Sequence, residues 1–170
     1  MKEAYRNMRN FWLDVKSFEG AKGLVPFGKE EIYAAGAEFC MPDNNNVLKN
    51  IIIAANALGD ASMYFENNSS SGLGGFVGQG HHTIKAASLD VLREADKMIY
   101  AMQPVKDLPP SVHCKVTLFA VSKKTIFYAQ FEEEQLRNPQ NIFYPFFATT
   151  QLLISAFKAQ EAASLKNKQG

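Results

Sequence analysis

The sequence predicts an α+β fold, a mostly helical single domain with the element order α-α-α-α-β-β-α. One antiparallel β-hairpin is expected to pack against a hydrophobic C-terminal helix. Over the first hundred residues, apolar side chains recur at intervals of three and four, which is typical of amphipathic helices. Between residues 112 and 131 they alternate instead, which is typical of strands. Residues 143–159 are apolar nearly all round and indicate a buried helix.

Four helices are expected in the first part of the chain. The first has an apolar stripe over residues 5–18, and Arg9 lies off that stripe. The second is expected over residues 29–40, where it ends before a proline. A third is expected over residues 47–63, because Asp and Asn residues stand ahead of it as candidate N-caps. The fourth should run from about residue 83 to residue 102.

The remainder of the chain predicts the hairpin and the last helix. Two alternating runs, residues 112–120 and 126–131, flank the short polar turn Ser122-Lys123-Lys124. The final helix is expected to begin near Pro145, because a proline in the first turn of a helix loses no hydrogen bond. It should run to about Leu165.

Length and composition predict one domain. The chain has 170 residues, of which 46% are hydrophobic, and this is enough for a real core. We expect a single domain over residues 1–165 and a frayed tail over residues 166–170. The net charge is +1, from 18 Lys and Arg against 17 Asp and Glu, so we expect neither a nucleic-acid partner nor a membrane partner.

The cellular compartment is predicted from the N-terminus and the cysteines. Charged residues interrupt the first twenty positions, which is unlike a secretory leader, and no apolar run is long enough for a membrane span. Cys40 and Cys114 are the two cysteines and neither belongs to a CxxC pair. We therefore expect a cytoplasmic protein with reduced thiols.

A glycine-rich segment, residues 67–82, is the first candidate contact element. It holds five Gly and three Ser in sixteen residues and predicts a flexible loop. Its glycines do not match GxGxxG, and no GK[ST] follows, so a phosphate loop is disfavoured. Long loops in compact domains often contact partners. From this segment we predict Gly74, Phe76 and Gln79 as partner-binding residues.

Histidines and charged residues complete the predicted partner surface. His81, His82 and His113 have neither metal-ligand spacing nor a catalytic signature, so we predict no metal, no cofactor and no catalytic residues. The predicted partner-binding residues are His81, His82, Lys123, Lys124, Glu132 and Glu133. The glutamates end the second strand, where the alternative is a solvated run of charge that protects a sheet edge. Lys106 and Lys115 would add to a basic patch near the hairpin tip.

Aromatic residues are concentrated in the last third of the chain. An ordinary large core would explain them, and so would an exposed patch used for self-association. For the second alternative we predict Phe143, Phe146 and Phe147 as residues of a homodimer interface.

The function that fits these features is a non-enzymatic protein-binding module. A small cytosolic inhibitor, immunity-type protein or adaptor that docks to another protein would have such a motif-poor sequence. One alternative is a small enzyme or ligand-binding protein whose site is built from the 72–82 loop and its histidines. Another is a structural subunit of a homo-oligomer.

Overall fold

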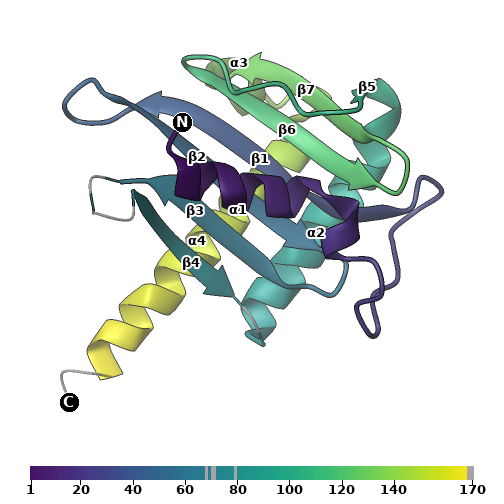
Figure 1. Ribbon diagram of the computed structural model, residues 1–170, viewed down its shortest axis with the longest axis horizontal. Helices are drawn as coiled ribbons and strands as arrows, with labels where there is room; N and C mark the ends of the chain where they lie inside the picture. The colour runs from purple at the N-terminus through teal and green to yellow at the C-terminus, as the bar shows by residue number, and fades with distance from the viewer. Residues whose placement is uncertain (68, 70–71, 79, 168–170) are drawn as a thin grey trace.

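The fold is dominated by a β-sheet. The computed structural model describes residues 1–67, 69, 72–78 and 80–167, and within residues 165–167 it describes the backbone alone. These described residues form a seven-stranded sheet in the order β4-β3-β2-β1-β6-β7-β5, and all neighbouring strands are antiparallel. Helices cover both faces (Figure 1). The prediction of a mostly helical domain with one hairpin is therefore wrong.

The elements have the following bounds. The strands are β1 (Ile32–Pro42), β2 (Leu48–Asn56), β3 (Ala61–Glu66), β4 (Leu73–Gly78), β5 (Gln103–Val105), β6 (Lys115–Ser122) and β7 (Ile126–Glu132). The α-helices are α1 (Glu3–Leu13), α2 (His82–Met98), α3 (Glu133–Arg137) and α4 (Tyr144–Asn167), and two short 3₁₀ helices are η1 (Val15–Ser17) and η2 (Ile99–Ala101).

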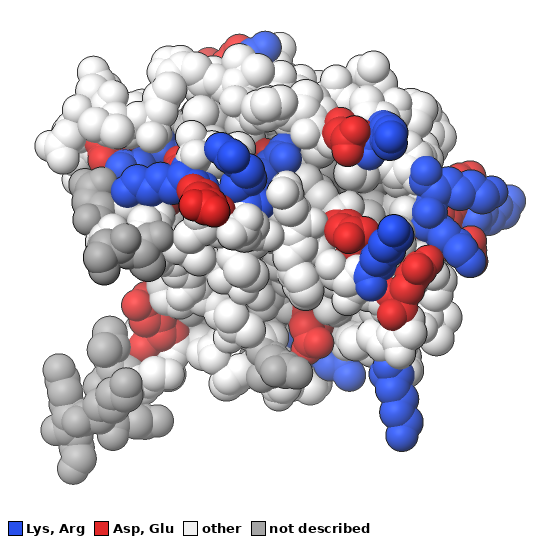
Figure 2. All heavy atoms as spheres, viewed as in Figure 1, with Lys and Arg blue, Asp and Glu red and all other residues white. Residues whose placement is uncertain are grey.

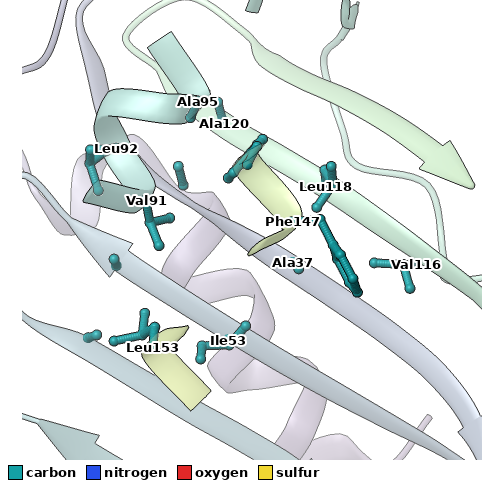
Figure 3. Packing of buried hydrophobic residues seen from close by; sticks show 14 of the residues in the cluster. Ala37, Ile53, Val91, Leu92, Ala95, Val116, Leu118, Ala120, Phe147 and Leu153 are labelled. Atoms are coloured by element: carbon teal, nitrogen blue, oxygen red, sulfur yellow. The ribbon is translucent and has the colours of Figure 1, made fainter. Parts of the chain in front are cut away.

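Two hydrophobic cores lie on opposite faces of the sheet. Helix α1 crosses the front face in Figure 1, and α2 and α4 lie behind the sheet. Behind it, side chains of α2 and α4 such as Val91 and Phe147 meet Ala37, Leu118 and other strand residues (Figure 3). In front, Tyr5 and other residues of α1 pack with residues of the strands below. The central strands are therefore buried on both faces.

Residues 29–40 and 47–63, predicted as helices, instead contain most of β1, all of β2 and the start of β3. A strand that is covered on both faces is apolar at consecutive positions, so its sequence lacks the alternation of a half-exposed strand. The β-branched run Ile51–Ile53 suits a strand. Gly36 is the clearest packing constraint, because a Cβ atom there would lie 2.0 Å from the Ile53 carbonyl oxygen of the neighbouring strand.

The glycine-rich segment is not a loop throughout, because residues 73–78 form the edge strand β4. The glycines allow aromatic rings of β3 to lie against the strand. A Cβ atom on Gly74 would lie 2.4 Å from the Phe65 ring, and one on Gly75 would lie 2.6 Å from the Tyr64 ring. Glycines in a strand permit such close approach, and composition alone suggested a flexible loop.

Other predicted elements are present. The first helix is α1 followed by η1, the fourth is α2 followed by η2, and the last is α4. The hairpin is β6 and β7, which form part of the larger sheet. The helix α4 continues to Asn167, beyond the predicted start of a frayed tail, and residues 168–170 lie outside the described part.

Two further observations concern the environment of the chain. Among the described residues, no helix has both the length and the apolar character needed to cross a bilayer. Cys40 and Cys114 are both free thiols, and the backbone N–H of Cys114 donates to the carbonyl oxygen of Cys40 at 2.8 Å.

Candidate functional site

A pocket of about 410 Å³ opens at the tip of the β6–β7 hairpin. Three parts of the chain enclose it: the C-terminal half of α1 with η1, the segment 106–108 after β5, and the β6–β7 turn. Its volume lies within the range of sites that bind small molecules or short peptide segments. The hairpin therefore forms one wall of a concave site.

The pocket combines buried apolar side chains with exposed charged ones. Buried side chains of Leu108, Val121 and Ile126 line it. The exposed side chains include three lysines from two different segments, which we call the rim lysines: Lys106 follows β5, and Lys123 and Lys124 form the turn between β6 and β7. Apolar surface next to convergent charged groups is typical of a binding site.

The rim lysines make no ion pair with any residue that the structure describes, although Asp14 and Asp107 line the same pocket. Asp14 instead accepts a hydrogen bond from the backbone N–H of Lys16 at 3.0 Å. On this face, basic and acidic side chains lie next to each other without a large patch of one sign (Figure 2). The three lysines are thus available to an incoming anion.

A buried ion pair fixes the wall formed by the 106–109 segment. The Nε of Arg9 donates to Oε1 of Glu38 at 2.8 Å, and both side chains are buried. The Nη2 of the same guanidinium donates to the carbonyl oxygens of Leu108 at 3.2 Å and Pro109 at 2.9 Å. Arg9 therefore ties α1, the central strand β1 and the pocket wall together.

Tyr5 completes the buried network. Its hydroxyl donates to the same Glu38 oxygen at 2.9 Å, and the ring is fully buried. Burial raises the pKa of the Tyr5 hydroxyl, and the Glu38 carboxylate raises that pKa further. The other carboxylate oxygen, Oε2 of Glu38, is buried and has no hydrogen-bond partner in the described part of the chain. This phenol remains a donor at neutral pH and holds α1 on the sheet.

The predicted partner-binding residues do not form one site. Lys123 and Lys124 lie at the pocket, but Gly74 and Phe76 lie in β4, at the edge of the sheet. Phe76 packs partly into the core behind the sheet, where its ring lies 6.3 Å from that of Phe157. Gln79 is outside the described residues.

The two histidines before and at the start of α2 lie near the β4 end of the molecule. The ring of His81 contacts the side-chain amide of Gln160 in α4 at 2.6 Å, and both His81 and His82 line a second hollow between α2 and α4. His113 precedes β6, four strand spacings or about 19 Å across the sheet from β4. The enzyme alternative requires the three histidines to meet in one pocket, and they do not.

The glutamates stand at the opposite end of the hairpin from its tip. Glu132 is the N-cap of α3 and forms a capping box with Gln135. Glu133 pairs with Arg137 at 2.5 Å, and Glu132 lies 3.8 Å from the ammonium group of Lys115. These contacts give both glutamates a role in local structure.

The aromatic residues predicted for self-association lie in the core. Phe143, Phe146 and Phe147 are 5%, 0% and 3% exposed, and they belong to the cluster behind the sheet. Their side chains offer little surface to a second copy in this conformation.

Arg9 and Glu38 are the residues of the site that the sequence analysis missed. Two signals pointed to them. Arg9 lies four residues after Tyr5 and three before Trp12, on the same face of α1, and both of these aromatic residues are buried. Glu38 is the one charged residue in the otherwise apolar run of β1. A charge in such a strand needs a buried partner.

We compared the chain with protein-family models, with curated proteins and with solved structures, and none of these comparisons gave a significant match. The geometry of the chain itself therefore carries the functional argument.

Proposed function

We propose that this chain is a non-enzymatic protein-binding module that docks an acidic segment of a partner protein in the hairpin-tip pocket. The observation that supports the proposal best is the set of three exposed rim lysines, none of them ion-paired with a described residue, beside buried apolar side chains of the pocket. A segment that combines carboxylates with an apolar side chain matches both features. An inhibitor or an adaptor would use such a pocket.

Local charge, and not the net charge, supports an acidic ligand. The chain as a whole carries +1, so its long-range field is weak. Within the pocket, Lys106, Lys123 and Lys124 outnumber Asp14 and Asp107, and the Arg9 charge is balanced by Glu38. Attraction is therefore confined to the pocket, and it should weaken as salt screens the exposed lysines.

The proposal includes the expectations from sequence about the environment. The low net charge disfavours nucleic-acid and membrane partners. The two free cysteines are consistent with a reducing compartment, and on that basis we propose that the protein works in the cytoplasm.

The experiment titrates the protein into a fluorescein-labelled peptide of alternating Glu and Leu and follows the fluorescence polarisation. The Lys123→Glu/Lys124→Glu variant should bind this peptide at least about tenfold more weakly than the unsubstituted chain, because two attractive contacts become repulsive. A peptide with Lys in place of Glu serves as the ligand control and should not bind.

The matched protein control is the Lys22→Glu/Lys29→Glu variant, which changes the net charge equally at exposed positions that do not line the pocket. We expect its affinity to stay within about twofold of the unsubstituted chain. Equal weakening by both double variants would show that the peptide senses overall charge, and the docking proposal would then be rejected.

A further inference from the structure

Among the described residues, β4 is the last strand on one side of the sheet, and no described strand pairs with its outer edge. The last strand at the other edge, β5, is three residues long and contains Pro104, and both features protect an edge from pairing. In contrast, β4 has six residues, LGGFVG, with neither a charge nor a proline. Edges of this kind are the ones that add a further strand.

The register shows which backbone groups of β4 face outward. The N–H of Asn67 donates to the carbonyl oxygen of Gly72, so this pair is a hydrogen-bonded one in the β3–β4 ladder. Hydrogen-bonded positions alternate along an antiparallel pair. Gly74, Phe76 and Gly78 therefore bond to β3, and the N–H and C=O groups of Gly75 and Val77 point away from the sheet.

These outward groups are self-complementary. When a second copy of β4 is placed antiparallel on a two-fold axis at Phe76, Gly75 of each copy stands opposite Val77 of the other. Such pairs exchange both backbone hydrogen bonds, which gives four bonds across the axis. The Val77 side chain is 60% exposed, and it would lie beside a glycine without a Cβ atom.

The helix α4 supplies a second self-complementary element. Its C-terminal part projects past β4 in Figure 1, and it passes under the Gly78 end of that strand, where a Cβ atom on Gly78 would lie 3.0 Å from Phe157. A two-fold axis that relates two paired copies of β4 lies half a strand spacing, about 2.4 Å, outside this strand. Along α4 this distance corresponds to about two residues beyond Phe157. The axis stands at Phe76, about two strand residues or roughly 6.6 Å from Gly78, so the two copies of α4 would run antiparallel on either side of it, with residues 159–160 of each copy nearest to the axis.

The charges on this part of α4 match the same axis. Lys158 and Glu161 are exposed and form no ion pair with another described residue. About an axis between residues 159 and 160, Lys158 of each copy faces Glu161 of the other. We infer that β4 and the projecting part of α4 bind a second copy of this chain, so that the two sheets join into one across a two-fold axis.

The experiment is sedimentation velocity over a range of protein concentrations. The unsubstituted chain should sediment as a dimer, and the Val77→Pro variant as a monomer, because the proline removes an outward N–H without removing a bond to β3. The Val77→Thr variant keeps the N–H and should remain a dimer. Far-UV circular dichroism, which follows the helix and strand content of the whole chain, reports whether each variant is folded.

A charge swap tests the same axis without altering the strand. Glu161→Lys places Lys158 against a like charge at two symmetric positions and should weaken the dimer about tenfold. The Lys158→Glu/Glu161→Lys double variant should restore it.

A monomeric unsubstituted chain at every concentration, a dimer that persists in the folded Val77→Pro variant, or a double variant as weak as the single one would overturn the inference. The docking pocket lies elsewhere, so its peptide titration is judged separately.

Discussion

Arg9 is the residue on which the front face of the molecule most depends. Its guanidinium compensates the Glu38 carboxylate, which is fully buried, and it also holds two carbonyl oxygens of the pocket wall. A buried ion pair adds little net stability relative to an apolar pair, but the loss of one partner leaves a buried charge uncompensated.

Replacement of Arg9 by Met should therefore lower the free energy of unfolding by about 3–5 kcal/mol. The Arg9→Met/Glu38→Gln double variant removes both charges and leaves an acceptor for the Tyr5 hydroxyl, so we expect it to recover a large part of the loss. Urea denaturation followed by Trp12 fluorescence measures both effects. Additive losses in the double variant would contradict this coupling.

The free energy of unfolding should depend on pH because of Glu66. Burial raises the pKa of the Glu66 carboxyl, but hydrogen bonds from the backbone N–H groups of Lys2 and Asn50 and from the Asn50 amide outweigh it, so the pKa is lowered overall. A carboxyl whose pKa is lower in the folded state than in the unfolded state stabilises the folded state. The full stabilisation is present at pH values above the pKa of the unfolded chain, about 4.3. This stabilisation is lost as the pH falls through the folded pKa.

We therefore expect the Glu66→Gln variant to be less stable than the unsubstituted chain at pH 7, and we expect the difference to be smaller at about pH 3, because the stabilisation by the carboxylate is lost as the pH falls through its folded pKa. Urea midpoints at the two pH values provide the comparison. A difference in stability that is the same at both pH values would show that the carboxylate charge makes no contribution.

At the scale of elements, three of the five predicted helices are present, but the other two are central strands and the short helix α3 was not predicted. Regular helical spacing and flanking breakers located α1, α2 and α4, and alternation located β6 and β7. The strands β1 and β2 are covered on both faces, so their apolar residues do not alternate, and short side chains such as Ala35 and Ala54 suggested a helix. These segments form strands because other parts of the chain bury them on both faces, and the pattern of a single sequence does not show that burial.

The same limit applies to the candidate site. The hairpin tip with Lys123 and Lys124 was predictable from the turn between two alternating runs. The expectation that Lys106 lies near this tip is also met, because β5 pairs with β7, whereas Lys115, expected in the same patch, lies at the other end of the hairpin beside Glu132. The approach of α1 to the hairpin depends on Arg9 and Glu38, which belong to elements that the sequence did not place next to each other.

Gly36 tests the close packing of β1 against β2. The Gly36→Ala variant should be destabilised by about 3 kcal/mol or more, because the added methyl group would overlap a backbone oxygen that cannot move independently. Thermal unfolding by circular dichroism measures the loss, and stability within 1 kcal/mol of the unsubstituted chain would contradict the described register of β1 and β2.

At the scale of the whole molecule, the two proposed contact surfaces are separate. The pocket lies at the β6–β7 turn, and the open edge is β4, at the other side of the sheet (Figure 1). A dimer joined at β4 would leave both pockets open, one in each copy. The molecule would then present two equivalent docking sites to an acidic partner.

The salt dependence of binding should distinguish the two contact surfaces. The peptide titration depends on exposed lysines, so we expect affinity for the Glu/Leu peptide to fall as salt rises from low to physiological concentration and beyond. The dimer rests on backbone hydrogen bonds between the two copies of β4 and also on two exposed Lys158–Glu161 pairs, so salt should weaken it less than it weakens the peptide complex. Sedimentation and polarisation at matched salt concentrations compare the two dependences, and a peptide affinity independent of salt would argue against the lysine rim.

The most direct test of the docking proposal is lysine labelling. The chain is acetylated with a limiting amine-reactive reagent, with and without the Glu/Leu peptide, and each lysine is quantified by mass spectrometry. We predict that the peptide protects Lys106, Lys123 and Lys124 and leaves Lys22, Lys29 and Lys158 unchanged. Protection spread evenly over all lysines, or none at the three rim lysines while the peptide is bound, would contradict the proposal.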